Sequence, residues 1–227
     1  GDFQMDPYRF IKLLCDDIAG RGGEVFVNRG VAGVGDNELT LSDGTRVGFS
    51  LCILATNGYT CFLFPQLKSI VWPIRGQIIA TKPAPGLNIF SSCQTNHGYE
   101  YWRSITDPKT GLQQLILGGK RHEDEVREQT SELGANPKII DALKSFAREK
   151  YDFEPELAAS WSGIMGFTRD SLPLTGLLPG KSNIYLNGGY TGYGLSYAFL
   201  TSKALVEKLL TEQSSHDVSH FDPRRFL

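Results

Sequence analysis

The segment Gly188-Gly189-Tyr190-Thr191-Gly192-Tyr193-Gly194 decides how the last part of this chain folds. It follows a short apolar stretch, 183–186, and precedes a helical pattern of apolar residues that runs to about Leu210. A glycine-dense turn at a helix start leaves backbone N–H groups uncovered and lets a flat or anionic ligand approach closely. The same glycines would also suit a plain strand-to-helix turn that needs positive φ, and the glycines alone favour neither interpretation.

The composition is that of an ordinary globular protein. Its 227 residues carry 23 Lys and Arg against 25 Asp and Glu, and 41% of them are hydrophobic. This balance argues against nucleic acid and against an acidic membrane surface as partners. No apolar run is long enough to span a bilayer, and residues 1–4 have neither the basic nor the apolar part of a secretion signal. Four cysteines without metal-binding spacing predict no metal site, reduced thiols and a cytoplasmic or other intracellular location (Cys15, Cys52, Cys61 and Cys93).

The first block, residues 1–58, has the pattern of part of an α/β layer. Asp6-Pro7 is typical of a helix start, because Asp caps the helix and Pro suits its first position. Asp43-Gly44 between two apolar stretches predicts a hairpin, and the continuous apolar run 51–55 predicts a buried strand. Further short strands are expected at 24–27 and 31–34.

The second block, residues 59–160, predicts an antiparallel sheet. Strands are expected at 71–81, 87–93, 99–105 and 113–117, and a turn at 106–111. Asn136-Pro137 then begins an amphipathic helix that would cover one side of the sheet. The whole chain is therefore predicted to be α+β.

The third block, residues 161–213, contains two further apolar stretches, the glycine turn and the last helix; 214–227 is a polar tail. We expect the last helix to bury a wide face. That face consists of Leu195, Ala198, Phe199, Ser202, Leu205, Val206 and Leu209.

The order of these motifs resembles the C-terminal part of the FAD-dependent amine oxidoreductases of the D-amino-acid oxidase and glycine oxidase family. The matching pieces, in chain order, are Asp6-Pro7, Gly22-Gly23-Glu24-Val25 before Val31, Asp43-Gly44, 55–60, 73–77, 161–170 and the final glycine turn. Each piece is weak alone, but seven in the family's order span nearly the whole chain. The resemblance implies that 1–58 and 161–213 form a partial FAD-binding domain and that 59–160 form the substrate-binding domain.

One expected motif has no counterpart here. The family's first FAD-binding element is G-x-G-x-x-G between a strand and a helix, which holds the pyrophosphate. We therefore expect FAD binding only together with the missing N-terminal portion, and an open face around Val25, Val27 and Ile53 that this portion or a homo-oligomer would cover. The alternative is a truncated relative without FAD, acting as a binding module or catalysing a redox-neutral reaction.

By resemblance, several residues are candidates for contact with the cofactor. The backbone at Val31 would meet the adenine end of FAD, and the turn Ala55-Thr56-Asn57-Gly58 would pass near the dinucleotide; a core valine and a plain strand-ending turn are the alternatives. The N–H groups of Gly192, Tyr193, Gly194 and Leu195 would meet a flavin carbonyl at a helix N-terminus. Arg75 is a lone charge in an apolar strand, so it either forms a structural ion pair or lies near the flavin.

The substrate side carries fewer signals. Tyr99, Tyr101 and Arg103 alternate with other residues and are predicted to share one sheet face, either lining the pocket or forming an aromatic cluster. Met165 stands where relatives that oxidise free amino acids carry an arginine for the carboxylate, so the resemblance does not imply a free α-amino acid as substrate. Ser162, Gly163 and Ile164 stand where relatives with covalent flavin can carry a cysteine, so non-covalent FAD is expected.

The activity that the resemblance implies is transfer of a hydride from a C–N bond of a small amine or amino-acid-like molecule to the flavin. This chemistry depends on orientation and a dry pocket more than on a titrating pair of side chains. The four histidines are scattered, and no catalytic acid or base is identified from the sequence.

Overall fold

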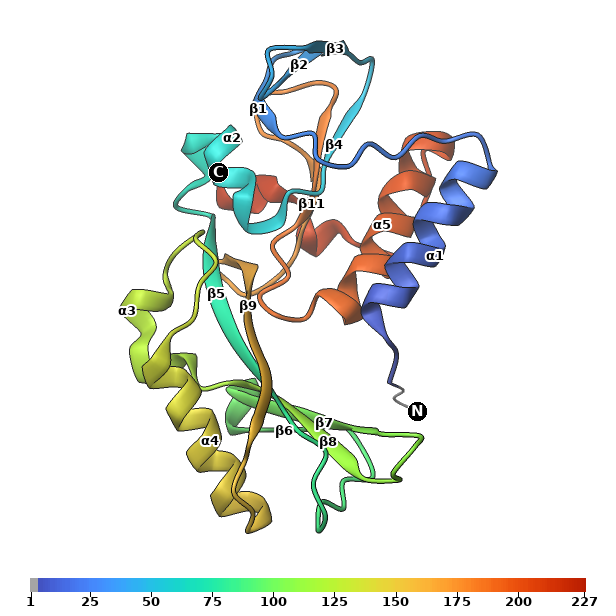
Figure 1. The fold of residues 1–227 in the computed structure, drawn as a ribbon. Helices are drawn as coiled ribbons and strands as arrows, with labels where there is room; N and C mark the ends of the chain where they lie inside the picture. The colour runs from blue at the N-terminus through green and yellow to red at the C-terminus, as the bar shows by residue number, and fades with distance from the viewer. Residues whose placement is uncertain (1–3) are drawn as a thin grey trace. The chain divides into compact units, whose positions relative to one another are not determined.

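The computed structural model describes residues 4–227, so the first three residues of the predicted 1–58 block and of the segment inspected for a secretion signal lie outside it. The chain forms two compact units (Figure 1). The first ends at Phe49, and the second runs from Ser50 to Leu227.

The first unit holds one helix and a small sheet. α1 (Pro7–Gly20) begins as predicted, because the Asp6 side chain accepts a hydrogen bond from the backbone N–H of Arg9 at 3.1 Å. Three strands, β1 (Val31–Val34), β2 (Glu38–Leu41) and β3 (Arg46–Gly48), pair antiparallel in the order β1-β2-β3. The predicted hairpin is confirmed, with Gly44 at φ 86° in the turn between β2 and β3.

The strand predicted at 24–27 is not formed. A strand exists only where a neighbour completes its hydrogen-bond ladder, and no described segment pairs with these residues. Val25 and Val27 are 45% and 73% exposed. The apolar residues at 24–27 are therefore exposed, as predicted for an open face, but they do not form the predicted strand.

The second unit contains a small mixed sheet in the order β10-β11-β4. β11 (Ile184–Gly188) pairs parallel with β4 (Cys52–Leu54) and antiparallel with β10 (Leu174–Leu177). α5 (Gly194–Thr211) follows β11 after the glycine turn, with Thr201, Ala204 and Leu205 buried.

The wide buried face predicted for α5 is only partly correct. Leu205 is buried, but Leu195, Phe199 and Val206 are 63%, 71% and 43% exposed. One narrow stripe packs on the small sheet, so the apolar periodicity describes a wider face than the sheet covers. The side chain of Ile53 on β4 is likewise 38% exposed.

The larger sheet of the second unit is antiparallel throughout, as predicted. Its strands are β5 (Val71–Thr81), β6 (Cys93–Thr95), β7 (Glu100–Thr106), β8 (Gln113–Gly119) and β9 (Leu157–Thr168), in the order β6-β7-β8-β5-β9. The predicted boundary between 160 and 161 falls inside β9. α3 (Glu125–Glu128) and α4 (Pro137–Tyr151) belong to the same unit.

One face of this sheet packs on α4 and forms the core. Ile139, Leu143 and Ala147 of α4 meet a cluster of buried sheet side chains that includes Ile79, Trp102, Leu115 and Leu117. α4 begins at the predicted Asn136-Pro137, and its apolar stripe lies at the helical spacing that the sequence shows. The opposite face of the sheet is therefore available for a site.

The strand predicted at 87–93 is shorter than expected. Only Cys93 and the two residues after it pair as β6, although Leu87 and Ile89 are buried. The Gln113 side chain takes the place of a neighbouring strand, since its Oε1 accepts from the N–H of Ile89 at 2.7 Å and its Nε2 donates to the Ile89 carbonyl at 3.0 Å. A side-chain amide has satisfied the backbone groups that a ladder would otherwise use.

Short helical pieces complete the second unit. The main elements are connected by α2 (Thr60–Leu63) and by 3₁₀ turns at Asn57–Tyr59, Pro65–Leu67, Asn96–Gly98, Arg121–Asp124, Ser219–Phe221 and Pro223–Phe226.

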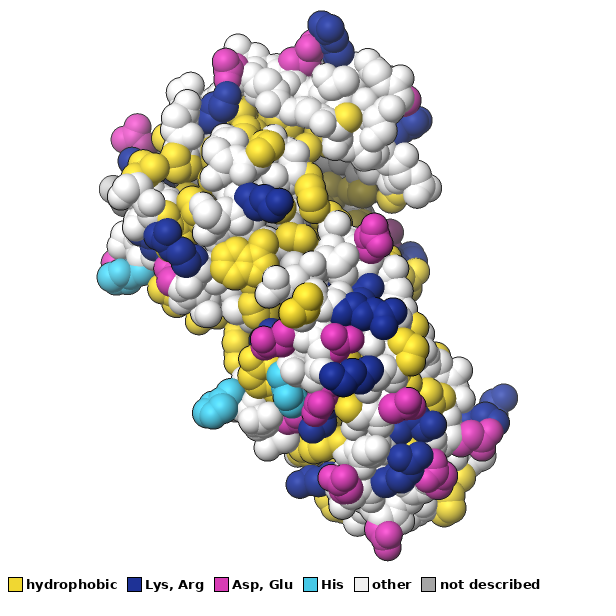
Figure 2. Space-filling view, turned by 90° about the vertical axis from the view of Figure 1, so that its left-hand side faces the viewer, with side chains coloured by type: hydrophobic (Ala, Val, Ile, Leu, Met, Phe, Trp, Pro, Cys, Tyr) yellow, Lys and Arg dark blue, Asp and Glu magenta, His cyan; other side chains and the backbone are white. Residues whose placement is uncertain are grey.

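Figure 2 shows positive and negative side chains interspersed over the lower part of the molecule. Among the helices of residues 4–227, none is long and apolar enough to cross a membrane.

Candidate active site

Two turns and one strand meet so closely that only glycine fits between them. A Cβ on Gly166 of β9 would lie 2.3 Å from Asn57 Oδ1 and 2.7 Å from the Gly58 nitrogen. A Cβ on Gly58 would in turn lie 2.7 Å from the Met165 carbonyl oxygen. Asn57 Oδ1 also accepts from the N–H of Gly189 at 2.9 Å, so this side chain joins the turn after β4 to the glycine turn after β11.

The glycine turn is fixed on β9 but leaves N–H groups uncovered. Thr191 donates its N–H to the Gly166 carbonyl at 2.8 Å, and Gly192 has φ 92°, which confirms the positive φ expected in this turn. In the described part of the chain, no acceptor pairs with the N–H groups of Gly192, Gly194 and Leu195. The first N–H groups of a helix have no partner inside it, so this end of α5 presents several donors together.

Met165 links this turn to the open face of the larger sheet. A Cβ on Gly192 would lie 3.9 Å from Met165 Sδ, and a Cβ on Gly76 of β5 would lie 3.0 Å from Met165 Cε. The same point on Gly76 is 4.0 Å from Tyr101 Oη. The structure thus brings together Met165 and Tyr101, both predicted for the substrate side, with Gly192, predicted for the cofactor side.

Three glycines on adjacent strands lie on one face of the sheet beside these side chains, and we call them the glycine floor: Gly118 of β8, Gly76 of β5 and Gly163 of β9. Gly118 pairs with Ile78, two residues along β5 from Gly76. Gly76 lies directly opposite Gly163 in the β5–β9 ladder. The Tyr101 ring lies over Gly118, since a Cβ there would come within 2.5 Å of ring atoms. A Cβ on Gly163 would meet nothing within 4 Å, so the floor is open at that end.

Tyr101 and Tyr99 do not share a strand face as predicted. Tyr101 is in β7, and burial of its hydroxyl end raises its pKa, an effect that the charge of Arg121 opposes. Tyr99 precedes the strand with φ −72° and ψ −19°, so the alternation of a strand does not extend to it. Its ring instead packs edge-on against His122 at 4.9 Å between centroids.

Arg75 forms the buried ion pair that was one of its two predicted roles. Its Nε and Nη2 donate to the two carboxylate oxygens of Glu128 at 3.1 and 2.8 Å, and its remaining donors reach the carbonyls of Glu132 and Arg127. Glu128 also accepts from Gln77 and Asn136. The guanidinium is therefore occupied on the face of β5 opposite the glycine floor.

The other predicted residues lie at these places. Thr56 Oγ1 is 2.8 Å from Thr60 Oγ1 in the turn that starts at Ala55, and Leu195 is exposed at the start of α5. Tyr193 reaches toward the connection before β7, where its Oη is 3.3 Å from the Cβ position of Gly98. Arg103 of β7 lies opposite Ile116 of β8 in the antiparallel ladder. Val31 pairs with Leu41 in the first unit.

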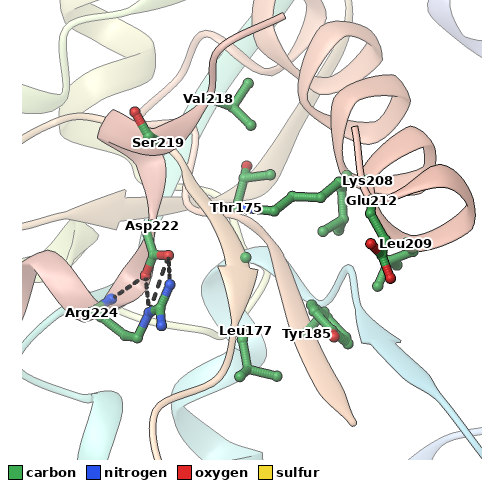
Figure 3. A pocket seen from close by; sticks show the side chains of 12 residues that line it. Thr175, Leu177, Tyr185, Lys208, Leu209, Glu212, Val218, Ser219, Asp222 and Arg224 are labelled. Atoms are coloured by element: carbon green, nitrogen blue, oxygen red, sulfur yellow. Dashed lines mark hydrogen bonds and ion pairs between the residues drawn. The ribbon is translucent and has the colours of Figure 1, made fainter. Parts of the chain in front are cut away.

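A larger cavity of about 320 Å³ lies elsewhere in the second unit, between β10, β11, α5 and the tail (Figure 3). Lys208 and Leu209 of α5 and Glu212 just after it line the cavity, together with Thr175 and Tyr185 from the strands. Asp222 and Arg224 on its rim pair with each other at 2.6 Å. The buried hydroxyl of Thr175 is bonded to Asn187 at 3.1 Å.

Sequence reasoning missed two features of the site. Glu128 was not recognised as the partner of Arg75, because the two residues are 53 positions apart and nothing local connects them. The glycine floor had a signal, since glycine inside a strand often marks a close approach of a ligand or another backbone.

Comparison with known proteins agrees with this architecture. The family described as FAD dependent oxidoreductase matches residues 1–208. Among solved structures, L-proline dehydrogenase from P. horikoshii resembles the chain with a TM-score of 0.79 at 16% identity, over 97% of this chain and 60% of that one. Glycine oxidase from Geobacillus kaustophilus gives a TM-score of 0.68 at 20% identity, over 90% and 54%.

Iminodiacetate oxidase from Chelativorans sp. gives a TM-score of 0.75 at 14% identity, over 95% of this chain and 58% of that one. No curated protein shows a significant match. At these identities the solved structures establish the fold, and the chain spans between 54% and 60% of the length of the three. The resemblance inferred from the order of motifs is confirmed: the chain belongs to the FAD dependent oxidoreductase family.

Proposed function

We propose that the protein containing this chain is an FAD-dependent oxidoreductase that acts on the C–N bond of an amine or amino-acid-like substrate. This chain would supply the substrate sheet and half of the flavin domain. The observation that carries the proposal is the meeting of the uncovered N–H groups at Gly192 and Gly194 with Met165 and Tyr101 above the glycine floor. The similar solved structures are a proline dehydrogenase, a glycine oxidase and an iminodiacetate oxidase, and these names support a small nitrogen-containing substrate.

The residues present fit the ring end of the cofactor. Several N–H donors at the start of α5 lack acceptors among residues 4–227, and Gly192 beside them carries no side chain. Donors at a helix N-terminus favour a carbonyl oxygen that gains negative charge. We assign Gly192, Gly194 and Leu195 to this end of FAD, with Asn57 holding the turn in place through Gly189.

The remaining contacts of the dinucleotide stay proposals. Val31, the turn Ala55-Thr56-Asn57-Gly58 and Tyr193 are proposed near FAD on the family resemblance. Arg75 is the weakest member of that set, because its donors are already used by Glu128 and two carbonyls. The pyrophosphate site is proposed to come from an N-terminal portion of the protein, which would also cover the exposed side chains of Val25, Val27 and Ile53.

Bound FAD would accept the hydride that leaves the carbon next to the substrate nitrogen. The chain's own residues would bind, orient and shield the substrate. The glycine floor lets a substrate approach the backbone of β5 and β9, and the Tyr101 ring closes one side. The Tyr101 hydroxyl is protonated near neutral pH, as any tyrosine with a pKa of about 10 or above is, so it can donate a hydrogen bond. Tyr99, Tyr101, Arg103 and Met165 are the proposed substrate-side residues.

The test uses the complete protein, purified with its natural N-terminal portion. We expect a non-covalent flavin that is released by denaturation, and we expect anaerobic addition of L-proline, glycine, iminodiacetate or a simple amine to bleach its absorption for at least one of them. The matched variant is Gly194→Val, which blocks the donors at the start of α5. A purified protein that neither contains FAD nor takes it up would contradict the proposal and favour the FAD-free alternative.

A further inference from the structure

The last residues of the chain are bound to the turn that follows β9. Arg225 of the tail donates from Nε and Nη2 to the two carboxylate oxygens of Asp170, at 2.7 and 2.9 Å. The same Nη2 donates to the Leu172 carbonyl at 3.0 Å. The side chains of Arg225 and Asp170 are only 18% and 33% exposed, so water screens this two-pronged pair less than it screens a surface pair.

The turn from Asp170 to Leu172 contains an unfavourable backbone conformation. Ser171 lies at its centre with φ 64°, in the left-handed region that residues other than glycine adopt only at an energetic cost. Such a conformation persists where the surrounding structure holds it. Asp170 Oδ1 accepts from the Leu172 N–H at 3.1 Å, and Arg225 binds both the Asp170 carboxylate and the Leu172 carbonyl. Arg225 therefore joins the two ends of the turn.

Two hydroxyl groups connect this turn to the glycine turn. Thr168 Oγ1 donates its one proton to the Leu172 carbonyl at 2.8 Å. In the 3.2 Å contact between the hydroxyls of Thr168 and Thr191, the donor is therefore Thr191. Thr191 Oγ1 also accepts from the backbone N–H of Thr168 at 3.3 Å. The Leu172 carbonyl is thus the acceptor at which the hydroxyl chain from Thr191 and the Arg225 side chain meet.

Thr191 has a conformation that a β-branched residue rarely adopts. Its φ is 50°, and the next residue, Gly192, has φ 92°. The Thr191 N–H donates to the Gly166 carbonyl, and its hydroxyl is bonded to Thr168, so backbone and side chain are both tied to β9. The direction of the uncovered N–H groups that follow, at Gly192 and Gly194, depends on these dihedral angles.

We propose that Arg225 is a positioning residue for the flavin. Acting through the turn after β9 and through Thr168 and Thr191, it holds the uncovered N–H groups of the glycine turn where they meet a flavin carbonyl. The inference rests on the proposed function, and it gives the C-terminal tail a role in that site.

The tail has anchors that do not depend on Arg225. Pro223 is buried against β10, where a Cβ on Gly176 would lie 3.2 Å from Pro223 Cδ. Phe221 packs edge-on against Tyr197 of α5, with 5.8 Å between ring centroids. Substitution of Arg225 should therefore loosen the turn after β9 without detaching the tail.

The experiment measures FAD binding and the reduction potential of the bound flavin in the complete protein. Flavin-depleted protein is titrated with FAD by the change in flavin fluorescence, and the potential is measured against a dye of known potential. We expect Arg225→Gln to weaken FAD binding by roughly 10- to 100-fold. The potential of the flavin that it binds should become more negative, because misplaced N–H donors stabilise the reduced ring less. Arg225→Lys should show smaller effects, since the charge remains without the two-pronged geometry.

The matched control is Arg224→Gln. Arg224 is the neighbouring arginine of the tail, and it pairs with Asp222 at 2.6 Å within its own turn (Figure 3). We expect this variant to leave FAD affinity and potential unchanged.

A double-mutant cycle tests the route through the hydroxyl groups. Thr168→Val removes the hydroxyl between Thr191 and the Leu172 carbonyl. Thr168→Val and Arg225→Gln together should weaken FAD binding by less than the product of their single effects, because both break the same connection. Effects that multiply fully would overturn the proposal, since the two residues would then act separately.

Unchanged FAD affinity and potential in a folded Arg225→Gln variant would also overturn it. So would a lower unfolding temperature without a change in potential, because a purely structural role gives that result. If Arg225→Gln does not fold, the same two measurements on Arg225→Lys decide.

Reduction of the flavin by amines separates this proposal from the proposed function. FAD binding that depends on Arg225, without reduction by any amine, would support the role of Arg225 and contradict the proposed function. Reduction by an amine in a protein whose FAD binding and potential do not depend on Arg225 would do the reverse. A complete protein that binds no FAD would contradict both.

Discussion

Arg75 on β5 and Glu128 on α3 form a two-pronged ion pair in which both side chains are almost completely buried, at 8% and 1% exposure. Gln77 and Asn136 donate to the same carboxylate at 3.0 and 2.8 Å. The pair therefore joins the larger sheet to the start of α4 through one acidic side chain. Buried charges are tolerated only when they are paired and hydrogen-bonded, so removing one member of this network leaves the others buried without their partners.

Glu128→Ala should destabilise the second unit strongly. It leaves the Arg75 guanidinium buried without a counter-ion and removes the acceptor for Gln77 and Asn136, and breaking a buried pair in this way costs about 3–5 kcal/mol. Chemical denaturation followed by circular dichroism measures the change. Glu154→Ala, which breaks the exposed pair with Arg148, is the control and should cost much less, because water screens exposed charges. Equal losses of unfolding free energy in the two variants would show that the buried ion pair stabilises the protein no more than the exposed one.

Stability should fall at acidic pH because of Glu128. Burial acts to raise its pKa, but the hydrogen bonds from Arg75, Asn136 and Gln77 outweigh burial and hold the pKa below its ordinary value of 4.5. A carboxylate with a depressed pKa stabilises the fold above the unfolded pKa, and this contribution is lost as pH falls through the lower, folded value. The free energy of unfolding, measured from pH 7 down to acid, should therefore decrease below about 4.5. In Glu128→Gln this part of the decrease should disappear; an unchanged profile would contradict the assignment.

Gly166→Ala should damage the junction between the two turns and β9. Its new methyl group would overlap with Asn57 Oδ1 and the Gly58 nitrogen, both of which are held by backbone geometry or hydrogen bonds. We expect a loss of about 1–3 kcal/mol, as for other overpacked sites. Gly163→Ala on the same strand is the control, because its methyl group meets open space and glycine is a poor strand residue. The thermal unfolding midpoint should therefore be lower for Gly166→Ala than for Gly163→Ala.

Gly163→Ala should nevertheless change the substrate range. The methyl group fills part of the glycine floor opposite Gly76, so larger substrates should lose more catalytic efficiency than small ones. The ratio of kcat/KM for a large and a small amine in the complete protein measures this effect. An unchanged ratio would place the substrate away from this end of the floor.

Gly194→Val should lower the flavin content of the complete protein with modest loss of stability. The valine side chain would lie beside the N–H donors at the start of α5, and its Cβ would be 3.6 Å from the Tyr190 ring. Flavin absorbance per protein, after gel filtration, is the measurement. A variant that keeps its full flavin content and activity would mean that the turn has only a structural role.

Local signals in the sequence were enough for most of the large elements. β5 has the bounds of the strand predicted at 71–81, α4 follows the helix period, and Asp6 and Asn136 mark where helices begin. The strand predicted at 24–27 failed for a non-local reason, since strands depend on partners that the same few residues cannot reveal. Tyr99 failed because a turn at 96–98 interrupts the alternation, and the segment 87–93 failed because Gln113 satisfies its backbone groups.

The site was predictable to the extent that it depends on glycine. Gly192 and the Asn57-Gly58 turn were recognisable because close backbone approach and positive φ leave few choices of residue. Arg75 predicted a partner but not which one, since any acidic residue brought near by the fold would have served.

The two faces of β5 divide its residues into two sets with different consequences for evolution. Arg75, Gln77 and Ile79 point toward the ion-pair network and the core, while Ile74 and Gly76 point toward the site. A library of single substitutions along this strand, read for both abundance and turnover, should therefore give phenotypes that alternate with a period of two. Lineages of this protein could diversify in substrate at every second position of one strand while the positions between them stay under selection for folding alone.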